Sequence, residues 1–141
     1  MLNPDAARSL SLWHEMVAQG DMKRLPTIVA PTALFRSPAV YKPYQGAPAM
    51  CLILNTVMTV FKDFAYHRSF VSDSGLDVVL EFSATVGDKS LKGIDMIRFD
   101  AHGKIAEFEV MIRPLNGLQA LAEEMGNKLA PYLQAGKAAQ G

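Results

Sequence analysis

The sequence has a single cysteine, Cys51, and no excess of charge of either sign. One cysteine excludes an intramolecular disulfide and is typical of a reducing compartment, so we expect a cytoplasmic protein in which Cys51 is a buried, inert thiol. Lysine and arginine together number 14, as do aspartate and glutamate, so the net charge at pH 7 is zero. Because no basic field exists to attract phosphates, neither nucleic acid nor a membrane surface is expected as a partner.

Long apolar stretches and metal-binding patterns are also missing. The longest apolar stretch, within residues 47–61, is shorter than the roughly 20 residues that cross a bilayer. No charged-then-apolar leader opens the chain, so we expect no signal peptide. The three histidines lie far apart, and no glycine-rich phosphate loop is present. The sequence therefore predicts a soluble protein with no metal and no cofactor.

Half of the 141 residues are hydrophobic, which is enough for one compact domain with its own core. We assign residues 1–134 to that domain and residues 135–141 to a flexible tail. Capping residues, helical spacing and prolines predict helices over 4–19, 21–30, 48–62 and 116–131. Alternating apolar residues predict strands over 33–37, 66–71, 76–86, 91–99 and 106–113. Helices segregated from a meander of antiparallel strands indicate an α+β fold.

One acidic residue, Asp95, lies among the apolar positions of the hairpin over residues 91–113. An even loop that closes at Gly103 sets Asp95 opposite Phe108, and the preceding hairpin sets it opposite Leu80. Two hairpins therefore place Asp95 on one apolar face of the sheet. A carboxyl there must pair, protonate or serve a site, because an isolated buried charge is costly.

The order of elements and several short motifs resemble those of the nuclear transport factor 2-like superfamily, which includes ketosteroid isomerases and SnoaL-like polyketide cyclases. The most specific motif is Ile94-Asp95-Met96-Ile97-Arg98-Phe99-Asp100 followed by Gly103-Lys104-Ile105, which looks closest to ketosteroid isomerases. The other motifs are Gly20-Asp21, Ser37-Pro38 and Gly46. The resemblance implies a strongly curved antiparallel sheet shaped as a cone, with helices packed on its concave face over an apolar pocket. It also implies a homodimer.

Ketosteroid isomerases use a base, a tyrosine and a protonated acid, and the resemblance carries these places to three residues here. The acid corresponds to Asp95, the tyrosine to Trp13 and the base to Ser37. Because only the acid is kept, we expect a protein that binds a small hydrophobic ligand. If it is catalytic, the resemblance implies a cofactor-free isomerase, cyclase or dehydratase that acts on an apolar carbonyl compound. The alternative is a non-catalytic binding module, or a dimeric interaction module, with the same fold.

A histidine on the strand over 66–71, His67, is the candidate proton carrier. An even turn after this strand would place His67 on the Asp95 face, whereas an odd turn would place Tyr66 and Arg68 there, and the sequence leaves both open. The residues expected to line the ligand pocket are Trp13, Ser37, Phe82, Ile97, Phe108 and Val110.

Each candidate also has a purely structural interpretation. Asp95 would be satisfied by a neighbouring hydroxyl, amide or water, and Trp13 would be a core anchor. His14, turned about 100° from Trp13 on its helix, is expected at the flank of the domain. Arg113 is expected to form ion pairs with glutamates of its own strand. A dimer with a filled core would have no pocket, whereas a cavity of roughly 300 Å3 or more would favour ligand binding.

Overall fold

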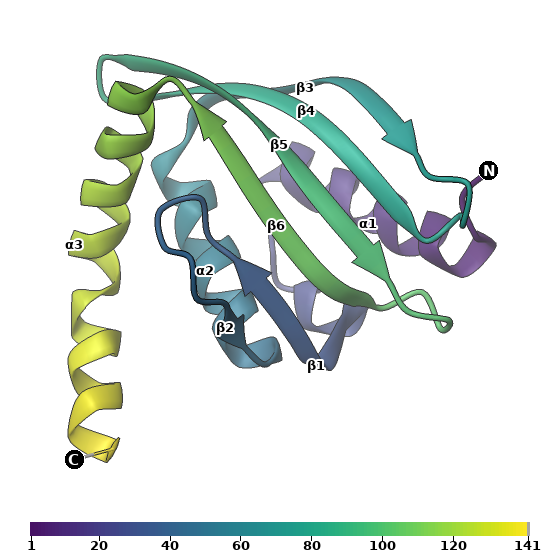
Figure 1. Cartoon of the computed structure of the whole chain (residues 1–141), viewed down its shortest axis with the longest axis horizontal. Coiled ribbons are helices and arrows are strands. Elements are labelled where there is room, and N and C mark those ends of the chain that lie inside the picture. The colour runs from purple at the N-terminus through teal and green to yellow at the C-terminus, as the bar shows by residue number, and fades with distance from the viewer. Residues whose placement is uncertain (141) are drawn as a thin grey trace.

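The computed structural model describes residues 1–140, with side chains up to residue 132, and within this range three α-helices flank one six-stranded sheet (Figure 1). The helices are α1 (Pro4–Gln19), α2 (Ala47–Val60) and α3 (Leu115–Gln140), with a short 3-10 helix, η1, at Leu25–Ile28. The strands are β1 (Val29–Arg36), β2 (Tyr44–Gln45), β3 (Lys62–Val71), β4 (Asp77–Val86), β5 (Lys89–Phe99) and β6 (Ile105–Arg113).

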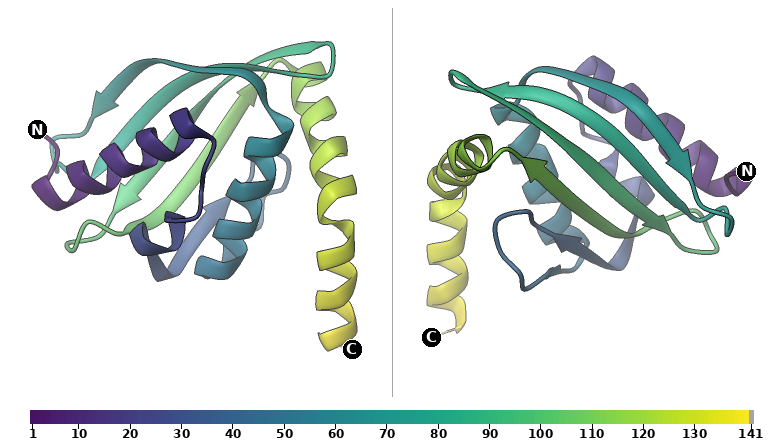
Figure 2. Two further views of the ribbon diagram at one scale, coloured as in Figure 1. Left: turned by 180° about the vertical axis from the view of Figure 1, so that it is seen from behind. Right: turned by 45° about the horizontal axis from the view of Figure 1, so that its top comes forward.

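The strands are ordered β2-β1-β6-β5-β4-β3 across the sheet. Strands β3 to β6 form the predicted antiparallel meander, whereas β1 joins β6 in parallel, so the sheet is mixed rather than wholly antiparallel. The sheet curves over α1 and α2, and α3 starts after β6 and runs beside α2 (Figures 1 and 2). The predicted α+β class, with helices against the concave face of a curved sheet, is confirmed.

The first helix begins and ends as the sequence predicts. The side-chain oxygen of Asn3 accepts hydrogen bonds from the backbone N–H groups of Asp5 and Ala6, at 2.9 and 3.3 Å. Gly20 follows the helix with a left-handed φ of 67°. Both ends therefore use the residue types that satisfy free backbone groups at helix termini.

Two prolines act differently from the prediction. Pro26 falls inside the helix predicted over 21–30, where only η1 forms before the chain enters β1, because proline supplies no backbone N–H. Pro131, predicted to end the last helix, lies inside α3, because the fixed φ of proline is compatible with a helix that gives up one backbone hydrogen bond. The tail predicted over 135–141 is therefore helical as far as Gln140, and residue 141 lies outside the described residues.

Strand β3 is irregular at two places in its pairing with β4. Between Lys62 and Ala65, and again between Tyr66 and Ser69, β3 has one residue more than the part of β4 opposite it. Asp63, in the first of these segments, has a positive φ of 53°. Each extra residue makes a β-bulge, which bends a strand and increases its twist. The bulges therefore contribute to the curvature of the sheet.

The loop between β5 and β6 is docked on the start of α1. The Ser9 hydroxyl donates a hydrogen bond of 2.5 Å to the carbonyl oxygen of Gly103, which has a left-handed φ of 78°. A Cβ atom built on Gly103 would lie 2.5 Å from the backbone carbonyl carbon of Asp5. The sequence predicts that Gly103 closes this loop, and the structure adds that no side chain fits there.

The core lies between the inner face of the sheet and the helices. Its largest fully buried side chains include Trp13, Phe82, Phe99 and Phe108. The rings of Trp13 and Phe108 meet edge to face, with centroids 5.2 Å apart, which ties α1 to β6. Within residues 1–140, no helix is both long and apolar enough to cross a membrane.

Candidate functional site

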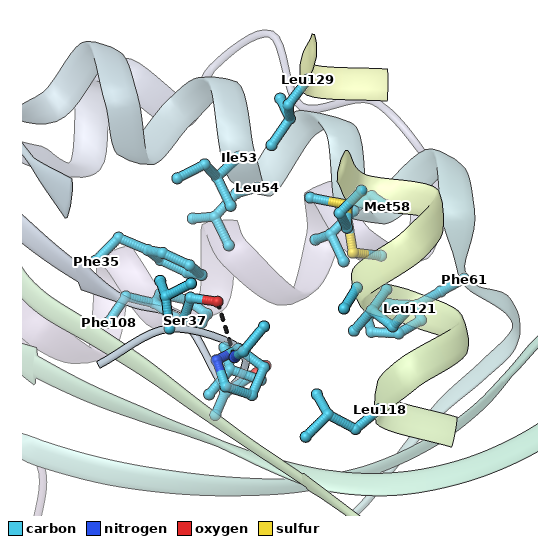
Figure 3. Close-up of a pocket in the computed structure, with 18 of the residues that line it drawn as sticks. Phe35, Ser37, Ile53, Leu54, Met58, Phe61, Phe108, Leu118, Leu121 and Leu129 are labelled. Atoms are coloured by element: carbon cyan, nitrogen blue, oxygen red, sulfur yellow. Dashed lines mark hydrogen bonds between the residues drawn. The ribbon is translucent and has the colours of Figure 1, made fainter. Parts of the chain in front are cut away.

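A cavity of about 360 Å3 lies between the inner face of the sheet, α2 and α3 (Figure 3). We call it the main cavity. Aliphatic and aromatic side chains form most of its wall, among them Phe35 of β1, Leu54 of α2 and Leu121 of α3. Asp95 of β5 and Tyr66 of β3 bring polar atoms to this wall. A carboxyl and a phenol thus face an otherwise apolar space that is large enough for a small molecule.

Asp95 is held on the inner face by its strand neighbours and by a chain of hydrogen bonds. It is opposite Leu80, as predicted, and opposite Val110 on the other side, and only 5% of it is exposed. The Tyr66 hydroxyl donates a hydrogen bond of 2.6 Å to Asp95 Oδ2. Trp13 Nε1 donates one of 2.9 Å to the Tyr66 hydroxyl oxygen. We call these residues the Trp13–Tyr66–Asp95 chain.

Trp13 determines which group donates and which accepts in the Trp13–Tyr66–Asp95 chain of hydrogen bonds. An indole N–H can only donate, so the Tyr66 oxygen accepts from Trp13, and the proton of Tyr66 is directed to Asp95. Asp95 Oδ2 is therefore engaged as an acceptor, and a proton carried by Asp95 belongs on Oδ1. This arrangement leaves Oδ1 as the atom through which Asp95 can act on a ligand in the main cavity.

The pKa values of Asp95 and Tyr66 are both raised, which favours the neutral form of each group. Burial raises the pKa of Asp95 to about 7, and the hydrogen bond from Tyr66 acts in the opposite direction. Burial, followed by the charge of Asp95, raises the pKa of Tyr66 well above its usual 10. At neutral pH a neutral phenol therefore lies beside a carboxyl close to half-protonation. Below pH 7 Asp95 can donate a hydrogen bond, and above pH 7 it can only accept.

The register of the Asp95 hairpin differs from the prediction by two residues. Asp95 is opposite Val110 rather than Phe108. The loop after Asp100 is one residue longer than expected, and a bulge at Ala106 adds a second residue. Because two shifts of one residue restore the alternation of faces, Asp95 stays on the inner face.

The candidate proton carrier, His67, lies on the outer face of the sheet, away from the Asp95 carboxyl. It is exposed, and its Nε2 is 2.7 Å from the Ser83 hydroxyl oxygen. The second bulge of β3 sets both His67 and Arg68 on the outer face and leaves Tyr66 on the inner face. Strict alternation of faces ignores the extra residue of the bulge. Neither an even nor an odd turn after β3 therefore predicts this arrangement. Placing His67 on the Asp95 face is therefore wrong.

The six residues predicted to line the pocket divide into two groups. Three of them, Ser37, Phe108 and Val110, border the main cavity. The other three, Trp13, Phe82 and Ile97, are buried in the core and do not border it. Trp13 nevertheless belongs to the site, because it holds the Tyr66 hydroxyl that contacts Asp95.

Ser37 borders the cavity at the place that the resemblance gives to a base. Its hydroxyl oxygen accepts a hydrogen bond of 3.0 Å from the backbone N–H of Ala39. A hydroxyl alone does not remove a carbon-bound proton at neutral pH. Asp95 is the one carboxyl among the described residues that border the cavity. In the part of the chain that the structure describes, no three His, Cys, Asp or Glu side chains are arranged to hold a metal ion.

Tyr66 is the site residue that the sequence pattern does not single out. The available clue is that Phe64 and Tyr66 are aromatic residues two positions apart, which is typical of a strand face packed on a core. The Phe64 and Tyr66 rings meet edge to face at 4.9 Å. His14, predicted at the flank of the domain, lies against the Tyr66 ring at 5.2 Å, and burial lowers its pKa.

We expect the substitution Tyr66→Phe to raise the pKa of Asp95 further. The change removes the hydrogen bond that stabilises the carboxylate, so burial acts unopposed and the proton is kept to higher pH. A carbon-13 NMR titration of the Asp95 carboxyl measures this change. Trp13→Phe is the matched control, because it removes only the first hydrogen bond of the chain and should change the pKa less. A lower Asp95 pKa in Tyr66→Phe would contradict the direction of the chain.

Comparisons with known proteins are consistent with this geometry. A family model described as the SnoaL-like domain matches residues 10–108, and a search of curated proteins gave no match. The structure is similar to that of a steroid delta-isomerase from Pseudomonas aeruginosa, with 59% identity and a TM-score of 0.91 over 94% of this chain and 97% of that one. It is also similar to an uncharacterized protein with a cystatin-like fold from Silicibacter pomeroyi, at 31% identity and a TM-score of 0.82 over 89% and 90% of the two chains. An NTF2-like protein of unknown function from Mesorhizobium loti shares the fold at 17% identity, with a TM-score of 0.69 over 81% and 99%.

Proposed function

The chain belongs to the SnoaL-like domain family, as its resemblance to the nuclear transport factor 2-like superfamily predicts, and we propose that its main cavity binds a small apolar carbonyl compound. In this proposal, protonated Asp95 donates a hydrogen bond to the carbonyl oxygen. The observation that carries the proposal is the Asp95 carboxyl, nearly buried, at the wall of an apolar cavity of about 360 Å3. Such a site favours a ligand with one polar atom and a hydrocarbon body.

The same contact would support a cofactor-free isomerisation. When a carbon–hydrogen bond next to a carbonyl group is broken, negative charge develops on the carbonyl oxygen, and a hydrogen bond from Asp95 stabilises that charge. Removing one donor of this kind typically costs about 2.7–4 kcal/mol of transition-state stabilisation. Steroid ketones are the first compounds to test, because the Pseudomonas aeruginosa protein with 59% identity is described as a steroid delta-isomerase.

We expect the affinity for a steroid ketone to fall as pH rises above 7, approaching a tenfold loss for each pH unit. The ketone accepts a hydrogen bond, and the protonated fraction of Asp95 declines with that slope well above its pKa of about 7. Equilibrium titrations between pH 5.5 and 9 measure the dependence. Asp95→Asn is the control, because its amide donates at every pH and should give a flat profile. A flat profile in the wild-type protein would contradict the role of Asp95 as a donor.

Binding without turnover is the second candidate function. It is favoured by Ser37, which lies where the resemblance places the base of a ketosteroid isomerase. A serine hydroxyl is not itself a base, and the hydrogen bond of Ser37 is to the backbone N–H of Ala39 rather than to a carboxylate. Incubation with a β,γ-unsaturated steroid ketone separates the two functions. Conversion to the conjugated ketone, slowed about 10²–10³-fold in Asp95→Leu, would support the isomerase. Tight binding with no conversion would support the binding protein.

We further propose a cytoplasmic homodimer of a single domain, residues 1–134, that associates through the outer face of the sheet. The support for the dimer is a group of exposed apolar side chains on that face, Phe70, Met96 and Met111. Val79 of β4 is paired with both Phe70 and Met96, and Met111 is paired with Ile94 of β5, so apolar residues link the three exposed side chains across the face. Sedimentation velocity tests the dimer, and a monomer at micromolar concentration would contradict it.

A further inference from the structure

A second cavity, of about 310 Å3, lies directly behind one wall of the main cavity. It is formed where the C-terminal end of α1 faces the C-terminal half of α2 (Figure 2). Met58, Phe61 and Phe64 border both cavities, so the partition between them is one layer of side chains. We call these three residues the partition, and Figure 3 shows Met58 and Phe61 on the main-cavity side.

The lining of the second cavity changes from apolar to polar. Met16 and Met22 are buried and, with Val17, form an apolar inner wall. Asn55 and Thr59 of α2 are exposed and place polar side chains at its outer rim. A hydrocarbon chain that enters from the main cavity would therefore meet apolar side chains first and reach polar groups only near solvent.

The members of the partition differ in how firmly they are held. Phe61 and Phe64 belong to an aromatic cluster in which their rings are 5.5 Å apart and Phe64 also packs on Tyr66. Met58 belongs to none of these ring pairs and is only partly buried. A methionine side chain is unbranched and has three rotatable bonds, so it adapts to irregular spaces at little cost. Met58 is therefore the member of the partition that can move aside while the support of Tyr66 is preserved.

We propose that the second cavity is an extension of the ligand site, which Met58 opens for the alkyl tail of a ligand too long for the main cavity. The inference rests on the proposed function, because the polar head of that ligand is the carbonyl group at Asp95. Two observations favour a hydrocarbon tail as the occupant. The partition between the two cavities is one side chain thick, and the inner wall of the second cavity is apolar. The ligand class is thus an elongated ketone with its carbonyl group near one end.

The test compares a short and a long methyl ketone, 2-octanone and 2-hexadecanone, on the full chain. The single tryptophan of the sequence, Trp13, donates to Tyr66 beside Asp95, so its fluorescence reports binding of the carbonyl group. Val17→Phe and Asn55→Phe each fill the second cavity from residues that do not border the main one, and neither adds a second tryptophan. Both should weaken 2-hexadecanone at least tenfold and leave 2-octanone unchanged, because each buried methylene raises affinity roughly fourfold.

A second pair of variants tests the partition from the other side. Met58→Ala opens it and should strengthen binding of 2-hexadecanone about tenfold relative to 2-octanone. Val57→Ala is the matched control, because Val57 is the preceding residue of α2 and borders only the main cavity. It should change the two ketones alike. Because Asn55 is exposed, Asn55→Phe keeps the test valid if Val17→Phe does not fold.

The outcomes separate this inference from the proposed function. If 2-octanone binds and the ratio of the two affinities is the same in wild type, Val17→Phe, Asn55→Phe and Met58→Ala, the extension is overturned and the ligand site stands. If neither ketone binds any variant, the proposed function and its extension both fall. A selective loss of the long ketone in the filled variants, with a selective gain in Met58→Ala, supports the extension.

Discussion

Replacing Asp95 by asparagine is expected to increase the free energy of unfolding at pH 8 by roughly 4 kcal/mol. Burial raises the pKa of Asp95 from 3.8 to about 7, and a pKa difference of one between the folded and unfolded states corresponds to about 1.4 kcal/mol. At pH 8 the wild-type fold must hold a nearly buried carboxylate, whereas asparagine keeps the shape without the charge. The asparagine oxygen can still accept the hydrogen bond from Tyr66. Urea unfolding at pH 8 measures the difference.

The pH dependence gives the same prediction a sharper form. Between pH 4 and 7 the unfolded chain has lost the Asp95 proton while the folded protein still holds it, so the contribution of Asp95 to stability falls as pH rises through this window. Below pH 4 both states are protonated, and above pH 7 neither is, so the contribution is constant outside the window. In Asp95→Asn this decline between pH 4 and 7 should disappear.

A carboxyl on the opposite face of the sheet supplies the control. Glu81 of β4 accepts two hydrogen bonds from the Arg68 guanidinium, which lowers its pKa to about 2. Its stabilising effect is present above pH 4.5 and is lost as pH falls toward 2, which is the reverse of Asp95. Glu81→Gln should therefore alter only the acid side of the profile. If wild type and Asp95→Asn show the same dependence of stability on pH between 4 and 7, Asp95 is not buried as described.

Gly103→Ala is expected to destabilise the protein by about 3 kcal/mol or more. Two effects add at this position. A left-handed φ costs a residue with a Cβ about 1–2 kcal/mol, and the added atom would collide with the backbone of Asp5, which overpacking data put at about 1–3 kcal/mol. Because the obstacle is backbone, relief would require the loop to leave α1 and the hydrogen bond from Ser9 to break. Thermal and urea unfolding measure the loss.

Gly87 provides a matched comparison for that prediction. It also lies in a hairpin turn and has a left-handed φ, 59°, but a Cβ there would meet nothing within 4 Å. Gly87→Ala should therefore show only the conformational part of the effect, about 1–2 kcal/mol. Equal losses at the two positions would mean that the contact between the Gly103 loop and α1 contributes nothing to stability.

The sequence predicts the strands of the meander and the face of Asp95 well, because alternation is a local property. The pairing of Leu80 with Asp95 follows from the tight turn between β4 and β5 and is confirmed. The pairing of Asp95 with Phe108 is wrong, because a longer loop and a bulge each add a residue. The face is nevertheless right, since the two added residues together shift the pairing by two positions, which restores the alternation of faces.

The partner of Asp95 could not be predicted in the same way. Tyr66 is 29 positions away in the sequence and reaches Asp95 across β4, which lies between β3 and β5. Its face depends on a bulge, and bulges depend on packing in three dimensions rather than on residue type alone. The same bulge explains why His67 is found on the outer face. The contact between Trp13 and Tyr66 likewise joins elements that no short-range pattern connects.

The bulges of β3 have a consequence for how this sheet meets other molecules. The outermost strands of a sheet expose unpaired backbone donors and acceptors that can recruit a strand from another chain. Here one outermost strand, β3, is interrupted twice within residues 62–69, and the other, β2, has only two residues. Neither offers a long, regular template for strand addition, which is how amyloid-like growth begins. The bending that contributes to the curvature of the sheet thus also protects the protein from aggregating edge to edge.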